Sequence, residues 1–128
     1  MVQRFIELGE GYSDLYELLE MAEANKHRIV KLLAFHSEYN GKQRSSAAAI
    51  MAPTPEGNFQ AIYLCREGIP DPRIRPSKRY ELFTSLADRL QKQIFELEIK
   101  PSEAFADKEL FYQYLIGILR MNKLLPNL

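Results

Sequence analysis

The chain has 128 residues, and 46% of them are hydrophobic, which is typical of one globular domain and not of a disordered chain. Seventeen basic and seventeen acidic residues cancel, so bulk charge gives no reason to expect a nucleic acid or a membrane as a partner. The single cysteine, Cys65, excludes an internal disulfide and a zinc site built from several cysteines, and we expect neither a cofactor nor a metal.

The first half of the chain predicts four strands and one helix. Apolar residues at a period of two indicate a first strand over residues 2–8, which the glycines at 9 and 11 end. A helix follows from about Ser13, which can cap it, to Asn25, because leucine and alanine recur there at helical spacing. The second, third and fourth strands are expected over residues 28–36, 46–51 and 59–65, with a hairpin turn at Asn40 and Gly41. Three alanines in the third of these strands would let a helix pack closely against it, although alanine also favours helix itself.

The second half predicts two more helices around one strand. Three prolines between residues 68 and 77 exclude regular structure there, and Ser77 then caps a helix that ends at about Lys92. A last helix runs from about residue 107 to residue 125, where Pro126 stops it. Residues 93–100 alternate at a period of two and predict a strand with one buried and one exposed face. The expected faces are Phe95, Leu97 and Ile99 toward the core, and Glu96, Glu98 and Lys100 toward solvent.

The predicted element order is βαβββαβα. This order indicates an α+β fold, in which a five-stranded mixed sheet packs with three helices. There is no internal repeat and no linker, so we expect residues 1–128 to form a single domain.

Two segments resemble a family of small uncharacterised proteins from Gram-positive bacilli. Residues 4–19 read RFIELGEGYSDLYELL, and residues 109–122 read ELFYQYLIGILRMN. The resemblance covers the whole chain and implies neither a settled activity nor catalytic residues. Some members carry the label methylthioribose kinase. A kinase of that type needs a glycine-rich phosphate loop, a catalytic-loop aspartate and a metal-binding Asp-Phe-Gly, none of which the sequence contains, so the residues argue against that label.

The segment Gly9, Glu10 and Gly11 resembles half of a dinucleotide-binding loop, in which glycines let backbone amides reach a phosphate. The third glycine of that pattern is missing, and the carboxylates of Glu10 and Asp14 would repel the anion. We therefore interpret the segment as a glycine turn that leads into a helix.

Cys65 and His36 offer a second candidate chemistry, because a thiol and an imidazole on adjacent strands can form a nucleophilic pair. Nothing in the spacing is specific to such a pair. A cysteine at the end of a core strand usually behaves as a small hydrophobic residue, and that is the interpretation we favour.

Asp71, Glu98 and Lys100 match the Pro-Asp…Glu-x-Lys pattern of metal-dependent nucleases. In that chemistry two carboxylates hold Mg²⁺, and the lysine on the same strand face polarises the attacking water. That family usually pairs its two acidic strands in a hairpin, whereas here the helix expected over residues 77–92 lies between them. An exposed strand face would produce the same letters, so the nuclease reading requires the two carboxylates to meet at one metal position.

A basic loop, residues 72–79, carries four cations and no acid: Arg73, Arg75, Lys78 and Arg79. Lys78 and Arg79 fall in the first turn of a helix, where positive charge opposes the helix dipole and costs about 0.3–1 kcal/mol each. Three prolines at 70, 72 and 76 would hold the loop stiff and reduce the entropy lost on binding. The loop therefore predicts an anion-binding site, although incidental surface arginines would give the same composition.

The last helix is apolar over most of its circumference, which predicts burial on more than one side. A second copy of the chain could supply the second cover, and we expect a homo-oligomer with Tyr112, Ile116 and Leu119 at the interface. The alternative is a central helix that the sheet and loops of the same chain cover.

These observations favour a small non-enzymatic interaction or regulatory protein that self-associates and binds a small anion or a protein. A Mg²⁺-dependent phosphodiesterase built on Asp71, Glu98 and Lys100 is the alternative. Nucleic acid is not expected, because residues 1–24 carry one basic and six acidic residues, a net charge of −5. The first residues of the chain are charged, unlike those of a signal peptide, and no apolar run approaches the length of roughly 20 residues that a spanning helix needs. We therefore expect a cytoplasmic protein.

Overall fold

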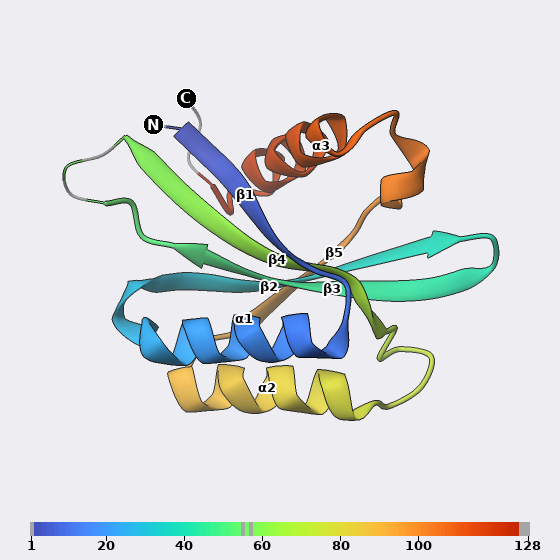
Figure 1. Cartoon of the computed structure of the whole chain (residues 1–128), viewed down its shortest axis with the longest axis horizontal. Helices are drawn as coiled ribbons and strands as arrows, with labels where there is room; N and C mark the ends of the chain where they lie inside the picture. The colour runs from blue at the N-terminus through green and yellow to red at the C-terminus, as the bar shows by residue number, and fades with distance from the viewer. Residues whose placement is uncertain (1, 55, 57, 126–128) are drawn as a thin grey trace.

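A five-stranded mixed sheet organises the chain in the computed structural model, which describes residues 2–54, 56 and 58–125. The strands lie in the order β1-β4-β3-β2-β5, with helices on both faces (Figure 1). The elements are β1 (Val2–Gly9), α1 (Tyr12–Ala24), η1 (Lys26–Arg28), β2 (Ile29–Tyr39), β3 (Lys42–Met51), β4 (Phe59–Pro70), α2 (Lys78–Leu90), β5 (Ile94–Glu98), η2 (Ser102–Ala104) and α3 (Lys108–Met121). The predicted α+β class and the order βαβββαβα are confirmed. No described helix has the length and apolar character needed to cross a membrane.

The strand directions bring many chain segments to one edge of the sheet. β1 pairs parallel with β4, and β2 pairs parallel with β5, whereas β3 runs antiparallel to both of its neighbours. The strands β1, β4, β2 and β5 therefore end at the same edge, which we call the carboxyl edge, on the right of Figure 1. α1 and α2 follow β1 and β4, and α3 follows β5, so these three α-helices begin at this edge.

Two hydrophobic clusters fill the space between the sheet and its helices. α1 and α2 lie side by side on one face and α3 lies on the other (Figure 1). The alternation of strand side chains divides the third strand between the clusters: Ala47 and Ala49 face α1 and α2, and Ala48 faces α3. Phe83 of α2 and Phe111 of α3 are fully buried in the respective clusters.

The strands around the carboxyl edge are longer than the sequence pattern predicts. β2 and β3 continue up to the hairpin turn at Asn40 and Gly41. β4 continues to Pro70, so the expectation of irregular structure from residue 68 is wrong for its first three residues. The cause is long-range pairing: after a register shift near Glu67, whose φ is 54°, Ile69 pairs with Ser45 on β3.

The helix boundaries confirm one predicted cap and correct another. Ser77 caps α2, since its hydroxyl accepts a hydrogen bond of 3.2 Å from the Tyr80 amide. Ser13 does not cap α1. The helix begins one residue earlier, and the carboxylate of Asp14 accepts the Gly11 N–H at 2.8 Å.

The last helix is shorter than predicted. α3 ends at Met121, and the next turn folds back so that the Leu124 N–H donates to the Leu119 carbonyl at 2.8 Å. Lys123 has a φ of 59°, a left-handed conformation that ends the helix. Pro126, which the sequence analysis expects to stop it, lies outside the described residues.

β5 has the predicted alternation, weakened because it is an edge strand. Glu96 and Glu98 form its polar face and are exposed, and Lys100 just beyond the strand is exposed too. Ile99 is buried, whereas Phe95 and Leu97 are half-buried against the α3 cluster.

Candidate functional site

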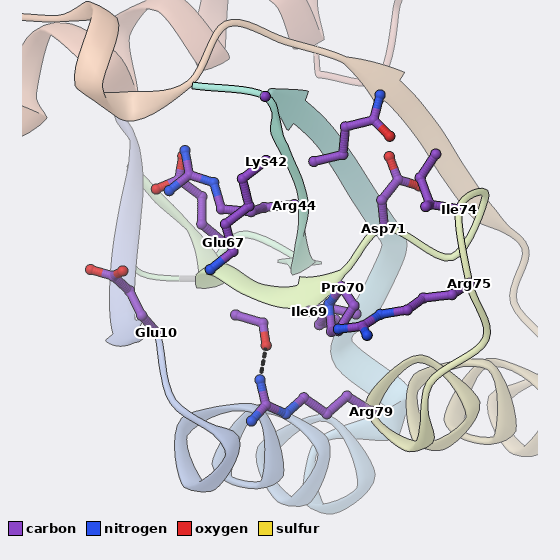
Figure 2. A pocket seen from close by; sticks show the side chains of 13 residues that line it. Glu10, Lys42, Arg44, Glu67, Ile69, Pro70, Asp71, Ile74, Arg75 and Arg79 are labelled. Carbon is purple, nitrogen blue, oxygen red and sulfur yellow. Dashed lines mark hydrogen bonds and ion pairs between the residues drawn. The ribbon is translucent and has the colours of Figure 1, made fainter. Parts of the chain in front are cut away.

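A cleft of about 650 Å³ opens at the carboxyl edge (Figure 2). It is formed by the residue after β1, the β2–β3 hairpin, the end of β4, the basic loop and the first turn of α2. In open α/β sheets, ligands commonly bind just outside the carboxyl ends of parallel strands. The position and size of the cleft therefore make it the candidate site of this protein.

The cleft exists because β4 is longer than the strand beside it. β1 pairs with β4 only as far as Gly9 opposite Cys65, whereas β4 continues to Pro70. The chain after β1 instead turns over Gly68, where a Cβ atom would clash with the Glu10 carbonyl. Glycine at 68 is thus needed for this close approach, which sets one wall of the cleft.

Besides Arg44, three cations line the cleft, each from a different element. Lys42 comes from β3, Arg75 from the basic loop and Arg79 from α2, and their side chains reach toward the Gly68–Pro70 stretch (Figure 2). The Arg79 guanidinium donates a hydrogen bond of 2.6 Å to the Gly68 carbonyl. Within the described part of the chain, the side chains of Lys42 and Arg75 have no hydrogen bond or ion pair. Their charges are available to a ligand.

The carboxylates that line the cleft are each paired with an arginine. Glu10 pairs with Arg66, and Asp71 pairs with Arg73 at 2.8 Å. Glu67 accepts from Arg44 at 3.0 Å and from Arg66 at the same distance. Because these pairs neutralise the acids locally, the unpaired charge of the cleft is positive.

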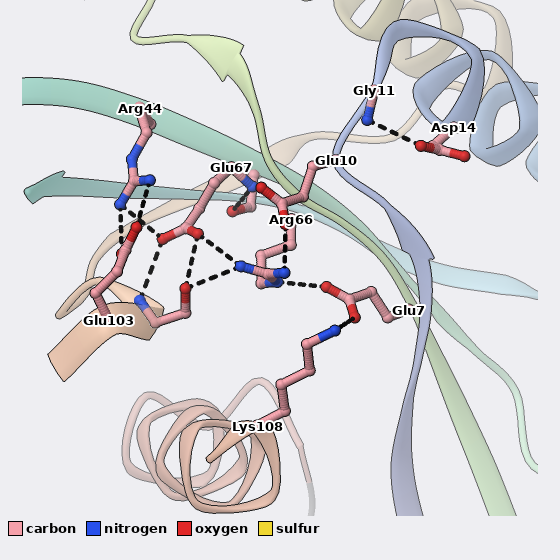
Figure 3. Close-up of polar contacts among 11 residues, drawn as sticks. Glu7, Glu10, Gly11, Asp14, Arg44, Arg66, Glu67, Glu103 and Lys108 are labelled. Atoms are coloured by element: carbon pink, nitrogen blue, oxygen red, sulfur yellow. Dashed lines mark hydrogen bonds and ion pairs between the residues drawn. The ribbon is translucent and has the colours of Figure 1, made fainter. Parts of the chain in front are cut away.

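A buried polar network around Glu67 supports one side of the cleft (Figure 3). The Glu67 side chain is 1% exposed, and it accepts hydrogen bonds from the Ser102 amide at 3.1 Å and the Ser102 hydroxyl at 2.8 Å, besides the two arginines. This Glu67 network ties β3, β4 and η2 together. It fixes the backbone at Arg44, two residues after Lys42.

The outer carboxylates of the same network have lowered pKa values. A bidentate hydrogen bond from Arg44 lowers the pKa of Glu103 to about 2, against the smaller effect of burial. Burial raises the pKa of Glu7, but hydrogen bonds from Lys108 and Arg66 outweigh it and hold that pKa below its usual range. Both groups therefore stabilise the fold in their ionised form.

Arg73 joins the two carboxylates that the nuclease alternative requires. Its guanidinium donates to Asp71 at 2.8 and 3.1 Å and also contacts Glu98. Hydrogen bonds from Arg73 lower the pKa of Asp71, despite burial, to below its usual value. Arg73 thus contacts both Asp71 and Glu98, whose proximity the sequence left open, and its guanidinium lies between them where a shared metal would have to bind.

Lys100 does not complete a nuclease site. It lies beyond the end of β5, and its backbone N–H donates to the Tyr114 hydroxyl at 3.0 Å. Among the residues that the structure describes, no group of three metal-ligating side chains is placed to hold an ion. The geometry gives the nuclease alternative no support.

The basic loop divides between two roles. Arg75 and Arg79 line the cleft, whereas Arg73 binds Asp71 and Glu98, and Lys78 is exposed and does not line it. Lys42, which lines the cleft from the β2–β3 hairpin, was not predicted from the sequence. The position of Lys42 directly after the predicted Asn40–Gly41 turn was a signal that it lies at the end of a hairpin. Only the pairing of β3 with β4 shows that this end of the hairpin lies near the basic loop.

The remaining candidate groups have structural contacts. Cys65 is buried, and burial raises the pKa of its thiol to about 11, which makes it a poor nucleophile. His36 contacts Ser45 at 2.6 Å and Glu96 at 2.9 Å instead. Ser45 is fully buried, so this Ser-His-Glu arrangement cannot meet a substrate. At the glycine turn, the Asp14 carboxylate binds the Gly11 N–H that a phosphate would need (Figure 3).

The predicted interface residues of α3 mostly pack inside the chain. Leu119 is fully buried and has no surface to offer a partner, so its assignment to an interface is wrong. Tyr112 stacks on Phe5 with ring centroids 5.4 Å apart, and Ile116 is half-buried against the same cluster. The same chain covers α3 on several sides: the sheet packs on one side, and Phe105 directly after η2 and residues 124–125 after the helix belong to the same cluster.

Self-association remains a prediction, with exposed apolar residues at both ends of α3. Met121 is 83% exposed, and Leu110 is exposed as well. We expect sedimentation equilibrium at micromolar concentration to give a mass above 14.9 kDa, and Leu110→Ser/Met121→Ser to restore the single-chain mass. A mass of 14.9 kDa at every concentration of the unaltered protein would refute the prediction.

Comparison with known proteins identifies a family but no activity. Neither the curated proteins nor the solved structures contain a match to the chain. The family model that describes the domain of unknown function DUF7147 matches residues 1–125. Residues 4–19 and 109–122 predict an uncharacterised family, and the chain belongs to such a family, DUF7147.

Proposed function

We propose that the protein is a non-enzymatic regulatory module that binds a small anion in the cleft at the carboxyl edge. One observation carries this proposal: Lys42, Arg75 and Arg79 converge there, while the neighbouring carboxylates are held by other arginines. A multiply charged phosphate or carboxylate would match this arrangement, because an anion gains most from several donors on different sides. Self-association and a cytoplasmic location remain part of the proposal.

The chemistry of the cleft favours binding over catalysis. A general base needs a carboxylate with a raised pKa, whereas Arg73 lowers the pKa of Asp71. The Glu67 carboxylate is equally occupied by four hydrogen-bond donors. Groups that are saturated in this way position neighbouring side chains and do not exchange protons with a substrate.

The basic loop is preorganised, which supports a binding role. The amides of Ile74 and Arg75 both donate to the Asp71 carbonyl, at 3.0 and 3.2 Å, and the Arg73 amide donates to the Asp71 side chain at 2.9 Å. Pro72 and Pro76 restrict the same loop. Little backbone entropy therefore remains to be lost when an anion binds Arg75.

Isothermal titration calorimetry with inorganic pyrophosphate at low ionic strength tests the proposal. Each charge-assisted hydrogen bond contributes about 1.5–3 kcal/mol. We therefore expect Lys42→Ala/Arg75→Ala to lower the affinity by about a hundredfold or more. The affinity of the unaltered protein should also fall as salt is added, because salt screens exposed charges.

A matched control separates the cleft from overall charge. Lys26 in η1 and Lys92 after α2 lie at the opposite edge of the sheet, so Lys26→Ala/Lys92→Ala removes the same charge away from the cleft. This control should bind pyrophosphate like the unaltered protein. Equal losses in both double variants, or no binding by the unaltered protein, would reject the proposed function.

A further inference from the structure

We infer that the ligand of the cleft is a phosphate monoester with an apolar or aromatic body, and that Ile74 is the contact for that body. The inference rests on the proposed function and narrows its ligand class. It depends on three features of the cleft: an exposed isoleucine, a rigid turn that holds it, and cations placed nearby.

Ile74 is an apolar side chain that is exposed to solvent at the rim of the cleft. It is 64% exposed and lines the cleft, next to Arg75 in sequence (Figure 2). A single exposed apolar residue on a surface needs no explanation, but one at the rim of a charged cleft offers an apolar contact to a ligand.

The turn that carries Ile74 is fixed and cannot fold the side chain away. Asp71, which is 2% exposed, accepts the Ile74 and Arg75 amides through its carbonyl and binds Arg73 through its carboxylate. Arg73 in turn contacts Glu98 at the end of β5, so the turn is attached to the sheet at two points. These contacts of Asp71 and Arg73 therefore keep the backbone at Ile74 in a position that exposes its side chain.

The space around Ile74 is larger than a bare inorganic anion needs. The cleft measures about 650 Å³, within the range of about 300–1,000 Å³ typical of sites for drug-sized molecules. A second hollow of about 350 Å³ shares Ile74 and Gln43 with the cleft. An organic body attached to the anion can thus lie over Ile74 without leaving the cations.

The arrangement of charge favours a phosphate monoester over a singly charged carboxylate. Lys42 and Arg75, the two cations of the cleft whose side chains have no hydrogen bond or ion pair within the described part of the chain, carry two positive charges, and a phosphate monoester carries close to two negative charges at neutral pH. Arginine binds its oxygens in a planar fork, and lysine binds them as a point charge. A singly charged carboxylate would leave part of this positive charge without a partner.

A matched pair of probes tests the inference. AMP and ribose 5-phosphate share the phosphate and the ribose and differ in the adenine, which supplies the apolar face. In calorimetric titrations we expect AMP to bind the unaltered protein at least tenfold more tightly than ribose 5-phosphate. Ile74→Ser should reduce the affinity for AMP about tenfold and leave that for ribose 5-phosphate unchanged.

The control is Val30→Ser, which removes an exposed apolar residue of β2 away from the cleft and should change neither affinity. Equal binding of AMP and ribose 5-phosphate, or equal losses of both in Ile74→Ser, would overturn the inference while leaving anion binding intact. Loss of both ligands in Lys42→Ala/Arg75→Ala is expected in either case. If pyrophosphate, AMP and ribose 5-phosphate all fail to bind the unaltered protein, the proposed function itself falls.

Discussion

Glu67→Ala is expected to lower the free energy of unfolding by about 3–5 kcal/mol, the range found when one partner of a buried ion pair is removed. The Glu67 side chain is 1% exposed, while those of Arg44 and Arg66 are 14% and 12% exposed. The substitution removes the fully buried carboxylate that Arg44 and Arg66 share, leaving Arg44 with Glu103 and Arg66 with Glu7 and Glu10, and it leaves Ser102 without its acceptor. Urea unfolding followed by circular dichroism measures the change.

Two further substitutions at the same position separate charge from backbone strain. Glu67 has a φ of 54°, a left-handed conformation that glycine adopts freely. Glu67→Gly should therefore be about 1 kcal/mol less destabilising than Glu67→Ala. Glu67→Gln keeps the shape and one acceptor oxygen for the Ser102 N–H but loses the charge, and its effect should lie below that of alanine. If all three variants unfold like the original protein, the Glu67 network contributes nothing to stability.

Arg73→Ala is expected to destabilise the protein by about 3 kcal/mol at neutral pH, because it leaves the buried Asp71 carboxylate without its cation. The estimate is at the lower end for such pairs, since Arg73 itself is 47% exposed and water reaches it. Anion affinity should fall as well, because Arg73 holds the turn that presents Arg75. Arg89→Ala is the matched control: Arg89 and Glu23 are both about half exposed, so its loss should cost less than about 1 kcal/mol.

The effect of Arg73→Ala should depend on pH with a definite sign. In the unaltered protein the pKa of Asp71 lies below its usual value of 3.8, so the ionised group stabilises the fold above about pH 4. That contribution is lost as the pH falls through the lowered pKa. The gap in stability between the two proteins should therefore be full at pH 7 and shrink below about pH 4. A gap of equal size at both pH values would show that Arg73 acts through packing and not through its charge.

The sequence by itself determined the elements and their order. The alternation of Phe95, Leu97 and Ile99 marks β5, the Asn40–Gly41 turn marks the β2–β3 hairpin, and Ser77 marks the start of α2. These features are local: a period of two or of 3.6, or a residue suited to a turn or a cap, acts within a few residues of itself. The fold class follows from such features because each element must bury its apolar face.

The boundaries at the carboxyl edge were decided by pairing between distant strands. Residues 68–70 contain a glycine and a proline and predict irregular structure, yet they extend β4, because β3 supplies backbone partners across the register shift near Glu67. In α3, only the packed structure shows that Leu119 faces the sheet and has no surface for a partner.

The candidate site depended on tertiary structure for the same reason. Charge along the chain identified the basic loop, but not that Arg73 is bound to Asp71 and Glu98 while Arg75 stays available. Nor could it place Lys42, more than thirty residues earlier, in the same cleft. Which charges cancel and which remain is set by distances of a few ångströms across strands, and these distances are fixed only when the strand order and register are fixed.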